Sequence, residues 1–283
     1  MKDLQSQICG MNMHYARYSL KTFLEAQNEL GIRQIEFWIG APHLYLDSRV
    51  FEEITPIKFL LQQYGISVPV VTTSSSAWQY QYAMGTHRSE CYSYFAQGIR
   101  AAKALGASIM TVNSGWGCGD ADSEAFSRSA EMLHALARFA EQNDIRLAME
   151  SLTPFETQIA YDLASTKRLW DQVNHPALEI MVDTVAMAKG GDTLEDWFST
   201  FGEHIIHMHF IDWMDVEDTA RHLAWGDGNA SPEQLFSICQ KYQYSGAFSQ
   251  EISAGGLYSH DPIAVDRRNY SRLRAAASLA EGQ

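Results

Sequence analysis

The sequence lacks an excess of basic residues. Its 283 residues include 21 Lys and Arg against 34 Asp and Glu, a formal net charge of −13 at pH 7. Clustered Lys and Arg are what a protein needs to bind nucleic acid or an anionic membrane surface, so we expect neither partner. The sequence also lacks any apolar run near the ~18 residues of a membrane span, and MKDLQSQICGMN (1–12) has no apolar segment typical of a signal peptide.

Paired cysteines are lacking too. Cys9, Cys91, Cys118 and Cys239 are widely scattered and form no C-x-x-C pair. This favours reduced thiols and a cytoplasmic location over a disulfide framework or a zinc knuckle. Cys118 lies in SGWGCGD, but a nucleophilic thiol needs an activating base that the sequence does not indicate. Neither this stretch nor CGMNMHYARY has the G-x-G-x-x-G spacing that a dinucleotide-binding open sheet would need.

Eight short apolar runs alternate with stretches of helical periodicity. Hydrophobic residues make up 46% and charged residues 19% of the chain, as in a globular protein with a sizeable core. Gly31, Gly65 and Gly106 each follow a helical stretch, as C-terminal caps do. We predict an α/β fold, a single (β/α)₈ TIM barrel over residues 1–283. The expected strands are 5–12, 33–40, 66–73, 107–114, 145–151, 178–184, 204–212 and 246–253, and the expected helices are 19–31, 51–65, 88–106, 123–144, 164–173, 193–202, 231–243 and about 262–279.

Charged or imidazole side chains close the last four expected strands. They are Glu150, Asp183, His209 and Glu251. In such a barrel these strand ends meet at one face, and buried carboxylates without a partner are costly. A shared cation reconciles them, and three carboxylates with one imidazole suit Mn²⁺, Co²⁺ or Mg²⁺ more than a structural zinc.

The stretch HIIHMHFID (204–212) places two histidines on one face of a strand. His207 and His209 are two residues apart, so their side chains point the same way, with His209 nearer the carboxyl end. We expect His209 to be the ligand and His207 to support it or to pack in the core. Direct ligation by His207 remains an alternative.

The chain resembles the xylose-isomerase-like barrel superfamily of sugar isomerases and epimerases. Within it, the chain is similar to fructoselysine 3-epimerase and related ketose 3-epimerases. The stretches that carry the resemblance are IEFWIGAPH (35–43), MESLTPFET (149–157), IMVDT (180–184), HIIHMHFID (204–212), HLAWGDG (222–228) and QEISAGGLY (250–258).

The resemblance implies a metal-dependent epimerase of a ketose or ketose conjugate at C3. The family's four metal ligands carry over onto Glu150, Asp183, His209 and Glu251, the same residues that the strand ends indicate. Glu150 and Glu251 would exchange the roles of general base and acid through a cis-enediolate. We expect one divalent ion, Mn²⁺ before Co²⁺, Mg²⁺ or Ni²⁺, a small-molecule sugar substrate, and assembly into a homo-oligomer, a dimer or tetramer.

Substrate contacts are expected from the loops that follow the strands. The candidates are Glu156, His222, Trp38, His43 and Trp116, with His14 a weaker one. The chain departs from many ketose 3-epimerases at three positions, which we expect to touch the sugar: Ala186 replaces a His, His222 an Arg, and Trp225 the Pro of a P-G-x-G turn. The identity of the sugar therefore stays open.

Other functions share the same predicted site. One is a lyase or dehydratase acting on a keto-sugar, a keto-inositol or a 3-oxo-glycoside. Another is an aldose–ketose isomerase, and a non-enzymatic sugar-binding module is a third. An apurinic endonuclease is disfavoured by the acidic charge and by the lack of additional metal-binding histidines. No Lys/Arg cluster indicates a phosphate pocket, which favours a sugar without phosphate.

Overall fold

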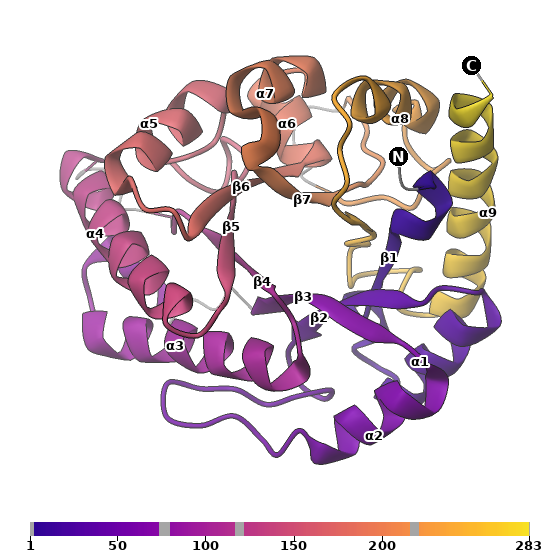
Figure 1. Ribbon diagram of the computed structural model, residues 1–283, viewed down its shortest axis with the longest axis horizontal. Helices are drawn as coiled ribbons and strands as arrows, with labels where there is room; N and C mark the ends of the chain where they lie inside the picture. Colours follow the sequence, from indigo (N-terminus) through magenta and orange to yellow (C-terminus); the bar gives the residue numbers. More distant parts are fainter. Residues whose placement is uncertain (1–2, 74–79, 117–121, 216–220, 283) are drawn as a thin grey trace.

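A closed barrel of eight parallel strands, in the order β1 to β8, forms the centre of the molecule (Figure 1). The computed structural model describes residues 3–73, 80–116, 122–215 and 221–282. The predicted (β/α)₈ fold is confirmed. The strands are β1 (Ile8–Met11), β2 (Gln34–Ile39), β3 (Ser67–Thr73), β4 (Ile109–Asn113), β5 (Arg146–Glu150), β6 (Leu178–Asp183), β7 (Ile205–His209) and β8 (Phe248–Ser249).

Helices form a ring around the strands (Figure 1). They are α1 (Leu20–Glu29), α2 (Thr55–Tyr64), α3 (Arg88–Leu105), α4 (Asp122–Glu141), α5 (Leu163–Val173), α6 (Thr184–Gly190), α7 (Leu194–Phe201), α8 (Pro232–Lys241) and α9 (Pro262–Glu281). Gly65 and Gly106 end α2 and α3 in the left-handed conformation, with φ of 61° and 86°. None of the helices in the described part of the chain is long and apolar enough to cross a membrane.

The sequence did not predict α6, and it overestimated the length of β8. Helix α6 has seven residues, too few to give a clear helical period. Strand β8 has two residues. The backbone N–H of Gln250 still donates to the carbonyl of Cys9 (3.0 Å), but the N–H of Ile252 turns back to the carbonyl of Gln250 (2.8 Å). Glu251 therefore lies two residues beyond β8, not at its end.

The inside of the barrel changes from apolar to polar along its axis. An apolar cluster has one buried member on each of β3 to β6, and Ile206 of β7 packs against it. Its buried members are Val70, Ile109, Ala148 and Met181. Residues further along the same strands are polar: Thr72 and Thr111 are buried and joined by a hydrogen bond of 2.6 Å. The polar side chains thus gather toward the carboxyl ends of the strands, where sites form in TIM barrels.

Asp266 on α9 links the last helix to the first strand–helix unit. Its buried carboxylate accepts hydrogen bonds from His14 Nε2 (3.0 Å), the Tyr15 hydroxyl (2.8 Å) and Gln27 Nε2 (2.7 Å). His14 is thereby held in the core, not at the site where the sequence placed it as a weak candidate. The predicted loop residue Cys118 and residues 74–79 lie outside the described residues.

Replacing Asp266 by Asn should destabilise the barrel. The change keeps the shape but replaces one acceptor oxygen by a donor, so a buried donor loses its partner. We expect the free energy of unfolding to fall by about 1–3 kcal/mol and the melting temperature to fall by a few degrees. Thermal unfolding followed by circular dichroism measures this, and an unchanged midpoint would contradict the role assigned to the network.

Candidate metal centre

Three of the four predicted ligands are the last residues of neighbouring strands. Glu150 ends β5, Asp183 ends β6 and His209 ends β7. A shift in register between β6 and β7 sets Met181 opposite His207 and Asp183 opposite His209. Glu251 reaches the same place from the segment after β8. One ligand atom from each of these four residues lies within 4.8 Å of the others.

The three carboxylates converge on Nδ1 of His209. This nitrogen lies 2.9 Å from Oε1 of Glu150, 2.8 Å from Oε2 of Glu251 and 3.5 Å from Oδ2 of Asp183. Nδ1 of His209 and Oδ2 of Asp183 are nevertheless buried without a hydrogen bond of normal geometry. No Lys or Arg of the described residues forms an ion pair with these carboxylates. The donor set therefore fits a divalent cation, because a cation would satisfy the lone pairs that converge here, among them those of Nδ1 of His209 and Oδ2 of Asp183.

Asp183 is oriented by the start of α6. Its Oδ1 accepts the backbone N–H groups of Val185 (2.7 Å) and Ala186 (2.9 Å), and so caps the helix. Because Oδ1 is occupied in this way, Oδ2 is the oxygen that faces His209. The short sequence DTVA thus fixes one ligand atom through local backbone geometry alone.

The site pushes the pKa values of its two glutamates apart. Burial raises the pKa of Glu150 to about 7, and the charges of Glu251 and Asp183 add to this against the opposing effect of His209. Burial also raises the pKa of Glu251, but His209 and His222 outweigh it and bring this pKa to about 2. The two glutamates therefore differ in their tendency to hold a proton when no cation is bound.

A cavity of about 130 Å³ opens beside these ligands. Of the predicted substrate contacts, Trp38, Trp116, Glu156 and His222 line it. Ala186 lines it as well. Glu156 is exposed at its edge, where its carboxylate accepts from the N–H (3.0 Å) and the hydroxyl (2.9 Å) of Thr153.

His222 touches two of the four ligands. Its Nδ1 lies 2.9 Å from Oε2 of Glu251, and its Nε2 lies 3.4 Å from Oδ2 of Asp183. Burial lowers the pKa of His222, but the charges of Asp183 and Glu251 raise it to about 10. His222 therefore adds a positive charge and hydrogen-bond donors to the wall of the cavity.

Asp212, the last residue of the stretch HIIHMHFID, holds the loop that carries His222. It lies beyond β7, and its buried carboxylate accepts the backbone N–H groups of Gly226 (3.0 Å), Gly228 (2.9 Å) and Ala230 (3.0 Å). A Cβ at Gly228 would lie 2.4 Å from Oδ1 of Asp212, so only glycine allows this approach. Asp212 thus shapes the segment after β7 and is not a member of the metal centre.

Two predicted contacts lie elsewhere. His43 is not among the residues that line the cavity; its Nδ1 bonds to Asn12 (2.7 Å) and its Nε2 to the carbonyl of Tyr18 (2.9 Å). Trp225, expected to touch the sugar, is buried in the core instead. Its indole N–H donates to the carbonyl of Phe210 (3.0 Å), and its ring lies 5.0 Å from the Phe210 ring, measured between centroids.

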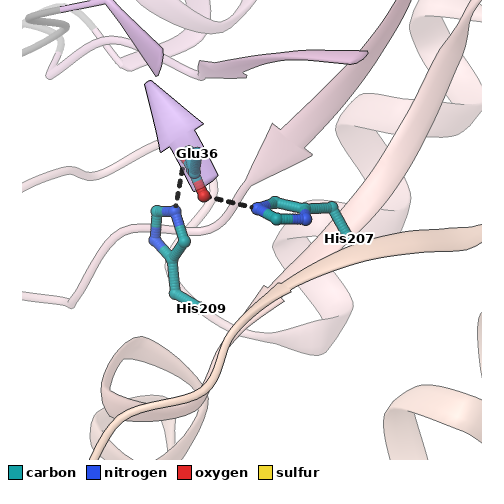
Figure 2. A group of neighbouring side chains, drawn as sticks. All are labelled: Glu36, His207 and His209. Carbon is teal, nitrogen blue, oxygen red and sulfur yellow. Dashed lines mark hydrogen bonds and ion pairs between the residues drawn. The ribbon is translucent and has the colours of Figure 1, made fainter. Parts of the chain in front are cut away.

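Sequence reasoning missed one residue, Glu36. It lies in the middle of β2, is fully buried, and contacts both His207 and His209 (Figure 2). Burial raises the pKa of Glu36, but the two imidazoles outweigh it and hold this pKa well below its ordinary value. The available signal was a single acidic residue within the apolar run QIEFWI.

A family model described as a xylose isomerase-like TIM barrel matches residues 24–275. The chain belongs to this family. It is 26% identical to fructoselysine 3-epimerase of Shigella flexneri over 270 residues, 94% of this chain and 95% of the relative. Two solved structures share the fold of this xylose isomerase-like barrel. One is an L-ribulose 3-epimerase, with a TM-score of 0.76 and 16% identity; the match covers 96% of this chain and 93% of that one. The other is the 3-keto-D-glucoside 4-epimerase of E. coli, with a TM-score of 0.72 and 15% identity; the match covers 92% of this chain and 99% of that one.

These matches confirm the resemblance that the sequence motifs carry. The named relatives are epimerases, so the prediction that this xylose isomerase-like chain is an enzyme is confirmed as well. The likeness to the solved structures is below 25% identity and shows the fold alone. The residues of the metal centre are therefore argued from the geometry given above.

The purified protein should bind about one equivalent of Mn²⁺ per chain, and chelation should lower its melting temperature, since the ligands converge only in the folded state. His209→Ala should weaken Mn²⁺ binding more than about a hundredfold, whereas His207→Ala should cost about tenfold. Titration against a competing chelator measures both. Equal losses in the two variants would contradict the assignment of His209 as the ligand.

Proposed function

We propose that the protein is a divalent-metal-dependent epimerase that inverts C3 of a ketose or ketose conjugate. The observation that carries the proposal is the pair Glu150 and Glu251. Their carboxylates reach one nitrogen of His209 at 2.9 and 2.8 Å from β5 and from the segment after β8, which are three strands apart around the barrel. An inversion needs one proton acceptor and one proton donor that serve two faces of the same carbon, and this pair supplies both.

The two glutamates would move the proton at C3. A divalent cation held by the four ligands would polarise the ketone next to C3 and lower the cost of removing that proton. Each carboxylate has two oxygens, so each glutamate can contribute one to the cation and keep the other for the proton. One glutamate would take the proton from one face of C3, and the other would return a proton to the opposite face. Asp183 and His209 would act as ligands only.

The cavity lining supports a neutral sugar as the substrate. No Lys or Arg is among the residues that line it in the described part of the chain, so it offers no paired cations for a phosphate. Trp38 and Trp116 would give flat apolar walls to the sugar, while Glu156 and His222 would bond its hydroxyls. With Ala186 at the wall instead of a larger His, the cavity has additional room at that point.

Replacing either Glu150 or Glu251 by Gln should lower kcat by about 10²- to 10⁴-fold, because Gln keeps an oxygen for the cation but cannot take up the proton. Metal content measured on the same samples separates a lost proton step from a lost metal. Glu179→Gln is the matched control, since this β6 glutamate pairs with His204 outside the cavity lining. A variant that holds its metal and retains more than about a tenth of the wild-type rate would contradict the role of that glutamate.

Turnover in D₂O tests the reaction itself. With Mn²⁺ present, fructoselysine and L-ribulose should each be offered, because they represent a conjugated and a free ketose. For the substrate that turns over, deuterium should enter C3 of the epimeric product, since the returned proton comes from a carboxyl group that exchanges with solvent. Label confined to C1 or C2 would indicate an aldose–ketose isomerase. Loss of water or of an aglycone would indicate a dehydratase or lyase, and either result would contradict the epimerase.

A further inference from the structure

The buried carboxylate of Glu36 lies between two histidines inside the barrel (Figure 2). Its Oε2 lies 2.7 Å from Nε2 of His207, and its Oε1 lies 3.1 Å from Nε2 of His209. All three residues have no solvent exposure. The hydroxyl of Thr72 also bonds to Oε1, so both oxygens of Glu36 are engaged.

The direction of these hydrogen bonds fixes the protons on His209. An ionised carboxylate can only accept, so the proton of the His209 bond must be on Nε2. In a neutral imidazole the other nitrogen, Nδ1, then carries the lone pair. Nδ1 is the atom that faces Glu150, Asp183 and Glu251. Glu36 therefore selects the form of the ring that can ligate a cation, and it holds the ring in the required orientation.

His207 holds the carboxylate of Glu36 in place, as Glu36 holds the ring of His209. Its Nε2 occupies the second oxygen of the carboxylate, while its Nδ1 is buried without a hydrogen-bond partner. Two rings two residues apart on β7 thus grip one carboxylate of β2 from a single strand face. Because both carboxylate oxygens already accept hydrogen bonds, we interpret this trio as a hydrogen-bonded group and not as a second metal site.

We propose that Glu36 is a positioning residue for the metal centre, and that His207 keeps its carboxylate in place. Glu36 does not touch the cavity. It acts through His209, by fixing the proton on Nε2 and aiming Nδ1 at the three carboxylates. Carboxylates that orient metal-bound histidines in this way typically contribute 10- to 100-fold to metal affinity. The inference rests on the metal centre and is independent of which sugar is used or which reaction follows.

Metal affinity is the first test. Glu36→Gln keeps the volume of the side chain but removes its charge and one acceptor, and Glu36→Leu removes both acceptors. We expect the Kd for Mn²⁺, from titration against a competing chelator, to rise about 10-fold in the first variant and about 100-fold in the second. Asp266→Asn is the matched control, because it alters another buried carboxylate that does not contact the site. Its Kd should stay within about threefold of wild type even though its stability falls.

Histidine NMR is the second test, and its first readout uses the wild-type protein alone. In ¹⁵N-histidine-labelled protein loaded with diamagnetic Mg²⁺, His209 should carry its proton on Nε2 and have an unprotonated Nδ1. The Nε2 proton should exchange slowly with solvent, in wild type and in Asp266→Asn, and should lose this protection in Glu36→Leu. A wild-type His209 with its proton on Nδ1 would overturn the proposal, as would Glu36 variants that bind Mn²⁺ with the wild-type Kd. Neither readout depends on turnover, so failure of the proposed reaction would leave this inference standing.

Discussion

The mutual repulsion of three closely spaced carboxylates is the constraint on which the site depends. Glu150, Asp183 and Glu251 bring three acidic groups around one nitrogen of His209, where Asp183 is buried and the side chains of Glu150 and Glu251 are only 12% and 14% exposed. Without a cation, bound protons must offset the negative charge, and the raised pKa values of Glu150 and His222 are in line with this. A divalent ion compensates the same charge while leaving the carboxylates ionised. On the proposed function, the bound metal would therefore stabilise the cluster in its ionised form.

The fold meets this constraint by fixing two of the ligands, Asp183 and His209, from outside the cavity. The cap of α6 holds Asp183, and Glu36 holds His209. Asp212 anchors the loop from which His222 reaches Glu251. The contacts to Asp183 and His209 use Oδ1 and Nε2, which do not face the site, so Oδ2 of Asp183 and Nδ1 of His209 stay available. Ligands that are already oriented by such contacts need less reorganisation when a metal or substrate binds.

The fold and the convergence of the four proposed ligands could be predicted from the sequence because both depend on local patterns. Apolar runs alternating with helical periods indicate the barrel, and a charged residue closing such a run points to the rim. Glu150, Asp183 and His209 follow this rule. Glu251 was identified by the same rule although β8 ends two residues earlier, because the segment after β8 continues in the direction of the strand for one more hydrogen bond.

The features that the sequence did not predict depend mainly on contacts between distant segments. Glu36 lies 173 residues from His209 in the sequence, and nothing local to β2 reveals that contact. His43 and Trp225 were expected to face the sugar from their loop positions, but a loop residue can turn inward, and both are bound in the core. Helix α6 was missed because Asp183, not a hydrophobic period, starts it. Hydrogen-bond partners, which sequence patterns do not specify, decide each of these cases.

Anomalous diffraction from crystals grown with Mn²⁺ tests the central claim most directly. The account predicts one manganese peak per chain, bonded to Nδ1 of His209 and to an oxygen of each of Glu150, Asp183 and Glu251, with Nε2 of His209 still bonded to Glu36. A peak held instead by Glu36, His207 and Nε2 of His209, or no peak at a manganese concentration that saturates binding in solution, would contradict it.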